Sequence, residues 1–514
     1  MSLSSEVSPM LFQFNTRVSL QEIAGQIGRP ATLKDIPNNL LDHLEAHGFK
    51  WFWSLGVWTT GSAGRKISGS NPVWHEDYQK DLPDFDQTDI CGSPFAICDY
   101  EVHPDFGGRQ ALADLRQRLA DRGIRLMTDF VPNHTALDHP WVSDHPEFFV
   151  HGGESDLEAE PRNYVRVMTK CGPRILAHGK DPWFDGWIDT LQLNYRCKEL
   201  QDVQRRVLHS IADQCDGVRC DMAMLLLPDI ISRTWGAKAT PLDGTSSTED
   251  CFWPRAIESV RARHKDFVFM AEVYWDLEWE LQQLGFDFTY DKRLYDRLLS
   301  FESVSVREHL RADLKFQQRS CRFLENHDER RVASILTASQ HLAAAVISFF
   351  SPGLRLFHDG QFEGRKRRVS MHLGRRAAET PDTLIQQLYG SLLNCLRSPA
   401  FHDGSWSLLE CLPEWEANST FRQFVSFAWE HPTERWLICV NYGPGTAQTF
   451  VQLPWTDLKG RTWSLTDELT QQTIVRDGND LFDRGLYLDV PAWHVHLFLV
   501  HEVTKRSVDE MQTV

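Results

Sequence analysis

The sequence predicts an α/β fold: a (β/α)8 TIM barrel with an inserted domain after its third strand and a C-terminal all-β sandwich. Strand-like and helix-like segments alternate over about 400 residues, which is typical of a parallel sheet connected by helices. No glycine-rich phosphate-binding turn follows the first strand, as an open doubly wound sheet would require. After residue 403 the helical pattern stops while short strand-like runs continue.

The first part of the barrel is predicted from the spacing of its apolar residues. Leu112, Leu115 and Leu119 recur at helical intervals, and Gly123 follows as a helix terminator. The predicted strands are 11–18, 49–55 and 124–130, and the predicted helices are 37–47 and 109–121.

The second part repeats the same alternation five times, which completes eight strand–helix units. The predicted strands are 217–221, 267–273, 286–290, 321–324 and 354–358, and the predicted helices are 202–214, 254–264, 304–314, 337–350 and 383–397. Eight such units with long insertions on the rim fit a (β/α)8 barrel.

Two stretches interrupt the alternation, and a third region ends it. Residues 135–190 are rich in His, Pro, Gly and Asp with little periodicity, and residues 235–253 also resemble a loop. The last region has strand-like runs at 421–430, 435–442, 449–453, 486–488 and 494–500. The predicted domains are a barrel (1–134 and 191–402), an inserted domain (135–190), a β-sandwich (403–502) and a polar tail (503–514).

The composition excludes several classes of protein. A net charge of −17 argues against a nucleic-acid partner, which needs a basic surface. The 11 cysteines include no C-x-x-C pair, so neither a zinc site nor a disulfide framework is expected. The chain begins without a signal-peptide pattern and has no run of 18 apolar residues, so we expect a cytoplasmic protein without a membrane partner.

Four short segments place polar residues after apolar runs, where barrel strands end. They are 128–134, 217–221, 270–273 and 325–328. The active site of a (β/α)8 barrel lies at the C-terminal ends of its strands, so the side chains of these segments are expected to meet there. Together they supply several carboxylates, two histidines and an arginine, and a pair of carboxylates is what cleavage of a glycosidic bond requires.

Asp221 and Glu272 are the predicted reacting pair. Arg219 lies two residues before Asp221, so both side chains leave the strand on the same face, and the guanidinium is expected to keep the carboxylate ionised. Glu272 has apolar and aromatic neighbours, which raise the pKa of a carboxyl as a general acid requires. Taken singly, Arg219 and Asp221 could be an ion pair that stabilises a strand end, and Glu272 could be an exposed rim residue.

The remaining candidates are weaker individually. Asp328 could accept hydrogen bonds from sugar hydroxyls and His327 could donate them, although hydrogen-bonded loop structure explains most His-Asp pairs. Asp129, Asn133 and His134 form the other cluster, for which an Asx-turn and a satisfied loop histidine are the structural alternatives.

In combination these motifs resemble the α-amylase superfamily, glycoside hydrolase family 13. The matching residues are Asp129, Asn133 and His134 after strand three, Gly217, Arg219 and Asp221 on strand four, Glu272 on strand five, His327 and Asp328 on strand seven, and Pro352, Gly353 and Gly360 around strand eight. The resemblance covers nearly the whole chain, including the insertion and the C-terminal sandwich.

The resemblance implies a retaining double displacement. Asp221 would be the nucleophile, Glu272 the general acid/base and Asp328 the residue that stabilises the transition state. Arg219, His134 and His327 would contact the sugar, and Asp129 and Phe95 are also expected to bind the substrate. An oligosaccharide or α-glucan would be the substrate partner.

Three departures from the family pattern concern substrate and metal. Phe95 stands where many relatives have a stacking tyrosine, and residues 222–227 are apolar where many amylases have Lys-His. Gln192 replaces an aspartate that binds calcium in many relatives, so we expect no cofactor and no bound calcium, although Asn133 is retained. The basic run 365–368 is either a site for an anion such as a sugar phosphate or, as the sequence favours, a solvated helix start.

Several functions remain open from the sequence. The leading one is a retaining α-glycosidase acting on maltodextrins or other α-glucans. The first alternative is a glucosyl- or maltosyltransferase that uses the same residues, including one that takes a sugar phosphate. A non-catalytic carbohydrate-binding relative would be expected to lack part of the carboxylate trio. An unrelated barrel isomerase or aldolase would not have this joint spacing. The sequence leaves the oligomeric state open.

Overall fold

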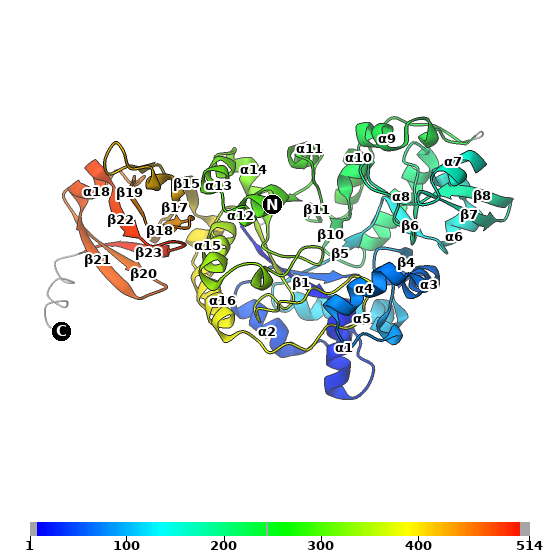
Figure 1. The fold of residues 1–514 in the computed structure, drawn as a ribbon, viewed down its shortest axis with the longest axis horizontal. Helices are drawn as coiled ribbons and strands as arrows, with labels where there is room; N and C mark the ends of the chain where they lie inside the picture. The colour runs from blue at the N-terminus through cyan, green and yellow to red at the C-terminus, as the bar shows by residue number, and fades with distance from the viewer. Residues whose placement is uncertain (1–7, 243–244, 504–514) are drawn as a thin grey trace.

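Eight parallel strands close into a barrel in the computed structural model, which describes residues 8–242 and 245–503. Their order around the barrel is β1-β14-β13-β12-β11-β10-β5-β2 (Figure 1). The strands are β1 (Met10–Asn15), β2 (Trp51–Leu55), β5 (Arg125–Phe130), β10 (Gly217–Cys220), β11 (Val268–Ala271), β12 (Phe288–Tyr290), β13 (Ser320–Arg322) and β14 (Leu354–His358). The predicted (β/α)8 barrel is therefore confirmed.

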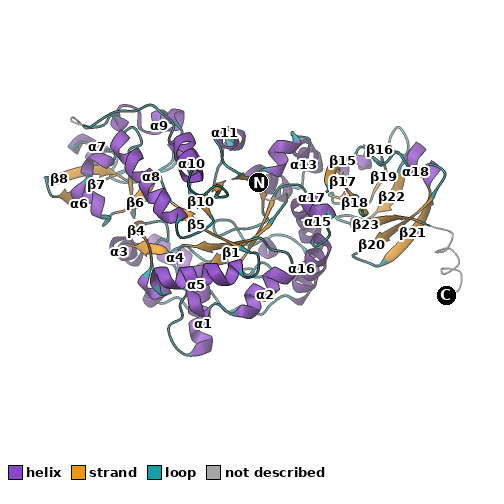
Figure 2. Ribbon diagram, turned by 180° about the vertical axis from the view of Figure 1, so that it is seen from behind, coloured by secondary structure: helices purple, strands orange, loops and turns teal. Residues whose placement is uncertain are grey.

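Helices connect the strands and surround the barrel (Figure 2). They include α1 (Thr16–Ile27), α2 (Asn38–Ala46), α5 (Gly108–Ala120), α8 (Lys198–Ala212), α10 (Phe252–Arg261), α12 (Lys292–Leu299), α13 (Ser303–Leu310), α15 (Ala338–Phe349) and α16 (Thr383–Leu396). In α5 the predicted stripe of Leu112, Leu115 and Leu119 is buried. Gly123 follows with φ +68°, a backbone conformation that suits glycine at the end of a helix.

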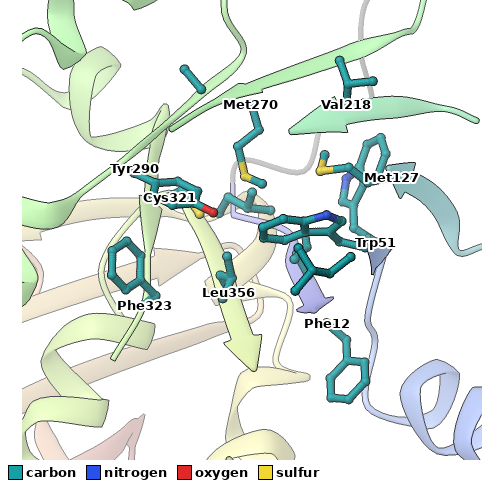
Figure 3. Close-up of a cluster of buried hydrophobic side chains, with 14 of the residues drawn as sticks. Phe12, Trp51, Met127, Val218, Met270, Tyr290, Cys321, Phe323 and Leu356 are labelled. Atoms are coloured by element: carbon teal, nitrogen blue, oxygen red, sulfur yellow. The ribbon is translucent and has the colours of Figure 1, made fainter. Parts of the chain in front are cut away.

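Each barrel strand contributes a buried apolar side chain to one cluster (Figure 3). The contributors, in chain order, are Phe12, Trp51, Met127, Val218, Met270, Tyr290, Cys321 and Leu356. Gly217 makes room for this packing, because a Cβ there would lie 2.9 Å from the carbonyl oxygen of Val268 and 3.1 Å from the Trp51 ring. The glycine that precedes Val218 is thus required by close packing between neighbouring strands.

The predicted first strand, 11–18, was too long. β1 ends at Asn15 and α1 begins at the next residue. The run stays mostly apolar because Val18 and Leu20 are buried by the helix, so hydrophobicity alone does not mark the change from strand to helix. Gly28, at φ +71°, ends α1 and donates its N–H to the Ala24 carbonyl.

The segment between β5 and β10 is more ordered than the sequence suggested. β6 (His134–Ala136) pairs with β9 (Thr190–Gln192), and β7 (Tyr164–Thr169) forms a hairpin with β8 (Gly172–Ala177). Two short helices, α6 (Pro140–Asp144) and α7 (Glu154–Ala159), also lie in this segment. In Figure 1 these elements project from one side of the barrel.

A second excursion follows β2 and escaped prediction. It contains the hairpin β3 (Trp58–Thr60) and β4 (Ile97–Val102) and the helices α3 (Ser62–Ser70) and α4 (Pro72–Asp81). Asn71 caps the start of α4 by accepting the Val73 N–H at 3.1 Å, and Pro72 is the first residue of the helix.

The C-terminal module consists of two antiparallel sheets, as predicted for a sandwich. The larger has the order β15-β17-β18-β23-β20-β21 and the smaller the order β16-β19-β22. The strands are β15 (Ser405–Leu408), β16 (Cys411–Leu412), β17 (Phe424–His431), β18 (Glu434–Asn441), β19 (Ala447–Val451), β20 (Thr462–Asp467), β21 (Gln472–Asp477), β22 (Leu486–Val490) and β23 (Val495–Glu502). The strands β15, β16, β20 and β21 were not predicted from the sequence; β21 is polar and mostly exposed. Except for residue 503, the predicted tail lies outside the described residues.

Within residues 8–242 and 245–503, no helix combines the length and the apolar composition that a bilayer crossing requires.

The buried His341 predicts a pH-dependent stability. Burial lowers its pKa to about 4, and its Nε2 lies 2.8 Å from the Tyr389 hydroxyl. Between pH 6.5 and 4 the unfolded chain therefore binds a proton that the native ring does not, so the free energy of unfolding falls as the pH falls, by up to about 3 kcal/mol from this residue.

His341→Gln should therefore lose less stability between pH 7 and pH 4.5 than the unmodified protein, as measured by denaturant titration. His145→Gln, at a half-exposed position, is the control. Parallel losses in the His341 variant and the unmodified protein would contradict the expectation.

Candidate active site

Arg219 lies at the centre of the strand-end residues. It is 1% exposed, and its guanidinium contacts two carboxylates, with Nη1 2.7 Å from Oδ1 of Asp221 and Nη2 2.7 Å from Oε2 of Glu272. Arg219 occupies the third position of β10, and Asp221 follows the strand directly. The parallel pairing of β10 with β11 brings Glu272 beside them, because Glu272 follows β11 in the same way.

Glu272 has two further hydrogen-bond donors. The Tyr274 hydroxyl donates to Oε1 at 2.8 Å, and the backbone N–H of Met222 donates to Oε2 at 2.8 Å. Met222 adopts φ +43°, which is uncommon for a residue with a side chain. This turn directs its N–H toward Glu272, so the backbone after β10 helps to hold the carboxylate in place.

Burial raises the pKa of all three candidate carboxyls, Asp221, Glu272 and Asp328, and the positive charge of Arg219 opposes the rise. The expectation that Arg219 simply keeps Asp221 ionised was therefore incomplete, since burial has the larger effect on its pKa. Glu272 follows its expectation, because desolvation and the charges of Asp221 and Asp328 all raise its pKa.

The two predicted histidines, His134 and His327, are both neutral at pH 7. Burial lowers the pKa of His134 to about 4 and that of His327 to about 3. Nδ1 of His327 lies 2.8 Å from Nε2 of Gln13, and its Nε2 lies 3.1 Å from Oδ2 of Asp328. The ring of Phe95 lies 5.4 Å from the His327 ring and 5.2 Å from the Arg219 guanidinium.

Asp129 does not line the cavity at the barrel mouth, although the sequence suggested a substrate contact. Its Oδ1 accepts from Nε1 of Trp53 at 3.1 Å and its Oδ2 accepts from the N–H of Gly56 at 2.7 Å. Burial raises its pKa to about 7. The carboxyl thus connects β5 to the end of β2 beneath the site, and we assign it no contact with a ligand.

A cavity of about 820 Å³ opens at this end of the barrel. Its lining includes the predicted residues Phe95, His134, Arg219, Asp221, Glu272 and Asp328. His327 and Asp129 are not part of the lining, so His327 contributes from behind Asp328 and Phe95.

Sequence reasoning missed several residues that line the cavity, among them Trp74, Asp189, Tyr274, Met371 and His372. Trp74 and His372 come from an unpredicted helix and from the loop after β14, and neither follows a barrel strand directly. Tyr274 lies two residues after Glu272, and that short spacing was the signal available in the sequence.

Gln192 occupies the position at which the family resemblance would place a calcium ligand. Its Nε2 donates to the carbonyl oxygen of Asn133 at 3.1 Å, to Oδ1 of Asn133 at 2.9 Å and to the carbonyl oxygen of Leu193 at 3.0 Å. Three oxygens that could bind a cation thus converge on an amide nitrogen. The described residues also hold no group of three or more His, Cys, Asp or Glu side chains suited to a metal. The residues present do not fit calcium at this point.

A chelator should therefore leave this protein unchanged. With 5 mM EDTA, roughly a thousandfold above trace metal, we expect the melting temperature and the activity to stay within error, because the Gln192 amide already satisfies the oxygens around it. A clear drop in melting temperature that added calcium reverses would show that a cation binds after all.

The basic run 365–368 forms no helix start, since α16 begins only at Thr383. Arg365 lies 3.5 Å from Glu22, Lys366 lies 3.6 Å from Asp382, and Arg368 lies 3.8 Å from Asp81. None of the four basic side chains lines the cavity. Three of these side chains are thus close to acidic residues of the same chain, and the Arg367 guanidinium donates to the Lys80 carbonyl oxygen at 3.1 Å. Arg368 also donates to the carbonyl oxygen of Asp328 at 3.3 Å, so it lies beside the site without lining the cavity.

This protein has a closed parallel barrel with the carboxylates of Asp221, Glu272 and Asp328 around a cavity at the strand ends. This arrangement is typical of glycoside hydrolases and transglycosylases with a barrel fold. Residues 87–372, more than half of the chain, match the family model described as "Alpha amylase, catalytic domain". The chain belongs to the α-amylase family.

Individual relatives are distant. α-Amylase MalA of Haloarcula japonica is 25% identical over 314 residues, which are 59% of this chain and 41% of that protein. The α-1,4-glucan:maltose-1-phosphate maltosyltransferase of Salinibacter ruber is 31% identical over 116 residues, 19% of this chain and 17% of that protein. This chain thus matches less than two thirds of the length of these curated relatives.

The same architecture recurs in a solved structure, the noncanonic maltogenic α-amylase AmyB from Thermotoga neapolitana. It superposes with a TM-score of 0.68 at 18% identity, covering 97% of this chain and 100% of that one. At this identity the likeness supports the fold.

Proposed function

We propose that this protein is a retaining α-glycosidase that hydrolyses α-glucosidic bonds of neutral α-glucans such as maltodextrins. The observation that carries the proposal is the shared contact of Asp221 and Glu272 with neighbouring nitrogens of the Arg219 guanidinium. Because one guanidinium holds both carboxyl groups, we expect them to lie close together. A separation of about 5 Å between the two carboxyls is typical of retaining enzymes, whereas inverting enzymes have ~6.5–9.5 Å.

The proposed first step forms a covalent intermediate. A carboxylate oxygen of Asp221 attacks the anomeric carbon, while Glu272 gives its proton to the glycosidic oxygen as the bond to the leaving sugar breaks. Burial supports the acid role, because it favours the protonated form of Glu272. Asp328, about a third exposed to the cavity, accepts hydrogen bonds from hydroxyls next to the reacting carbon.

The proposed second step returns the enzyme to its starting state. Glu272, now ionised, takes a proton from a water molecule, which attacks the anomeric carbon and releases Asp221. Arg219 stays bound to both carboxylates, so the cation offsets the negative charge that moves between them. Neutral His134 lines the cavity and can hydrogen-bond sugar hydroxyls without adding charge.

The charge of the cavity favours a neutral substrate over a sugar phosphate. Five carboxylates line it: Asp185, Asp189, Asp221, Glu272 and Asp328. Its two arginines are both engaged, Arg219 as described and Arg162 with Asp185 at 3.0 Å. A phosphate group would meet an excess of negative charge here. We therefore place transfer from a sugar phosphate second, although the Salinibacter relative is named as a maltose-1-phosphate maltosyltransferase.

Incubation with maltoheptaose tests this function. We expect shorter maltooligosaccharides, with the α-anomer released first in NMR spectra, and the same products with or without inorganic phosphate. Release of the β-anomer first would contradict retention, phosphate-dependent products would favour the transferase, and the absence of any product would favour a non-catalytic relative.

A further inference from the structure

Asp189 is a cavity carboxylate that the proposed reaction does not use. It stands directly before β9, is 4% exposed and lines the cavity. Its Oδ2 has no hydrogen-bond partner among the residues that the structure describes. Buried polar atoms in folded proteins are almost always hydrogen-bonded, so an unpaired carboxylate oxygen on a residue that lines a cavity points to a ligand donor.

A histidine lies across a narrow gap from this oxygen. Nε2 of His372 is 3.7 Å from Oδ2 of Asp189, which is too long for a direct hydrogen bond. The His372 ring stacks on the Trp74 ring, with centroids 4.5 Å apart and planes inclined by 10°. Asp189, Trp74 and His372 thus form one wall of the cavity, and we refer to these three residues as the end wall.

The end wall is held in place by contacts behind it. Tyr78, Leu82, Ile90, Leu373 and Ala377 form a separate buried cluster beneath α4 and the loop after β14. The His372 carbonyl accepts the Cys91 N–H at 2.9 Å, and the Gly374 N–H donates to the Asp89 carbonyl at 2.8 Å. These contacts fix the loop on both sides of His372, so the His372 ring is held in place at the cavity.

A sugar hydroxyl can bridge Asp189 and His372 from one side. A hydroxyl both donates and accepts, so one group can donate to Oδ2 of Asp189 and accept from an N–H on Nε2 of His372. The stacked Trp74 and His372 rings add an apolar surface of the kind that packs against the C–H face of a pyranose.

We propose that Asp189 is a specificity-determining residue that accepts a hydrogen bond from one hydroxyl of a pyranose unit bound against the end wall. This inference rests on the proposed function, because it takes the bound molecule to be an α-glucan. The recognised hydroxyl must be free, so a substrate that lacks it is bound poorly. Asp189 contributes to substrate binding and leaves the bond-breaking step to other residues.

Asp189→Asn tests this with little change in shape. We expect a 10- to 100-fold loss in kcat/KM on maltotriose, mainly through KM, as is typical when a hydrogen bond to a charged group is lost. Asp144→Asn is the control, because Asp144 lies in the same inserted segment and pairs with Lys170 at 2.9 Å but does not line the cavity. That variant should change kcat/KM by less than about threefold.

A set of monodeoxy maltosides separates recognition from a structural role. In the unmodified protein, removal of one particular hydroxyl should lower kcat/KM by about the same factor as Asp189→Asn. In the Asp189→Asn variant, removal of that same hydroxyl should cause no further loss of kcat/KM. Equal losses for every deoxy sugar in both proteins would overturn the proposal, as would unchanged kinetics in Asp189→Asn. If Asp189→Asn folds poorly, His372→Gln should give the same cancellation at the same deoxy position, and its absence would overturn the proposal.

Calorimetric titration with maltotriose distinguishes this inference from the proposed function. If the unmodified protein binds maltotriose but cleaves nothing, and Asp189→Asn weakens this binding at least tenfold, the hydrolase proposal is refuted and the end-wall proposal is supported. Cleavage with binding that Asp189→Asn does not change would refute the end wall alone.

Discussion

Glu272→Gln should lower kcat/KM on maltooligosaccharides by roughly 10²- to 10⁴-fold, the usual contribution of a general acid. The loss should be much smaller on an aryl α-glucoside with a good leaving group, because such a bond breaks without protonation. The amide keeps the size of the side chain and its contact with the Tyr274 hydroxyl, so we expect the melting temperature to change little. Initial rates on both substrates measure the difference.

Glu280→Gln is the control for this variant. Glu280 lies in α11 (Glu278–Gln283), on the same chain segment but exposed, and its loss should leave both rates unchanged. Equal losses of the Glu272 variant on both substrates would mean that the residue does not protonate the leaving group.

Asp221→Asn should have the largest effect of all, a loss of roughly 10⁴-fold or more on every substrate, because no other group can form the covalent intermediate. Mass spectrometry provides a second measurement. A 5-fluoro-α-glucosyl fluoride should label the unmodified protein through an ester at Asp221 and leave the variant unlabelled.

Asp229→Asn, an exposed substitution at the start of α9 (Pro228–Trp235), is the control and should be labelled normally. Labelling at another carboxylate, or near-normal turnover by Asp221→Asn, would exclude Asp221 as the nucleophile.

Site residues could be predicted from the sequence where they directly follow a barrel strand. Arg219 and Asp221 were predicted to share a face because they are two residues apart, and Glu272 was placed beside them by the order of a parallel barrel. Asp129 fitted the same pattern and proved to support β2 instead, because a motif does not say whether a carboxylate faces the cavity or the barrel core.

The end wall could not have been predicted in the same way. Trp74, Asp189 and His372 are separated by more than a hundred residues from one to the next, and no periodic pattern connects them. A small buried cluster around Tyr78 and Leu373 fixes the loop of His372 against α4, and Asp189 approaches His372 from the start of β9. Such contacts depend on tertiary packing, which local propensity and hydrophobic period do not record.

The shared guanidinium of Arg219 has a consequence for how this protein should titrate. Asp221, Glu272 and Asp328 influence one another's protonation, and the positive charge of Arg219 favours the ionised form of all three. The limbs of a bell-shaped pH–rate curve would then be macroscopic constants of the cluster, and neither limb would belong to one side chain. Neutralising any one member should move both limbs together, so the pH optimum is a property of the whole charge cluster.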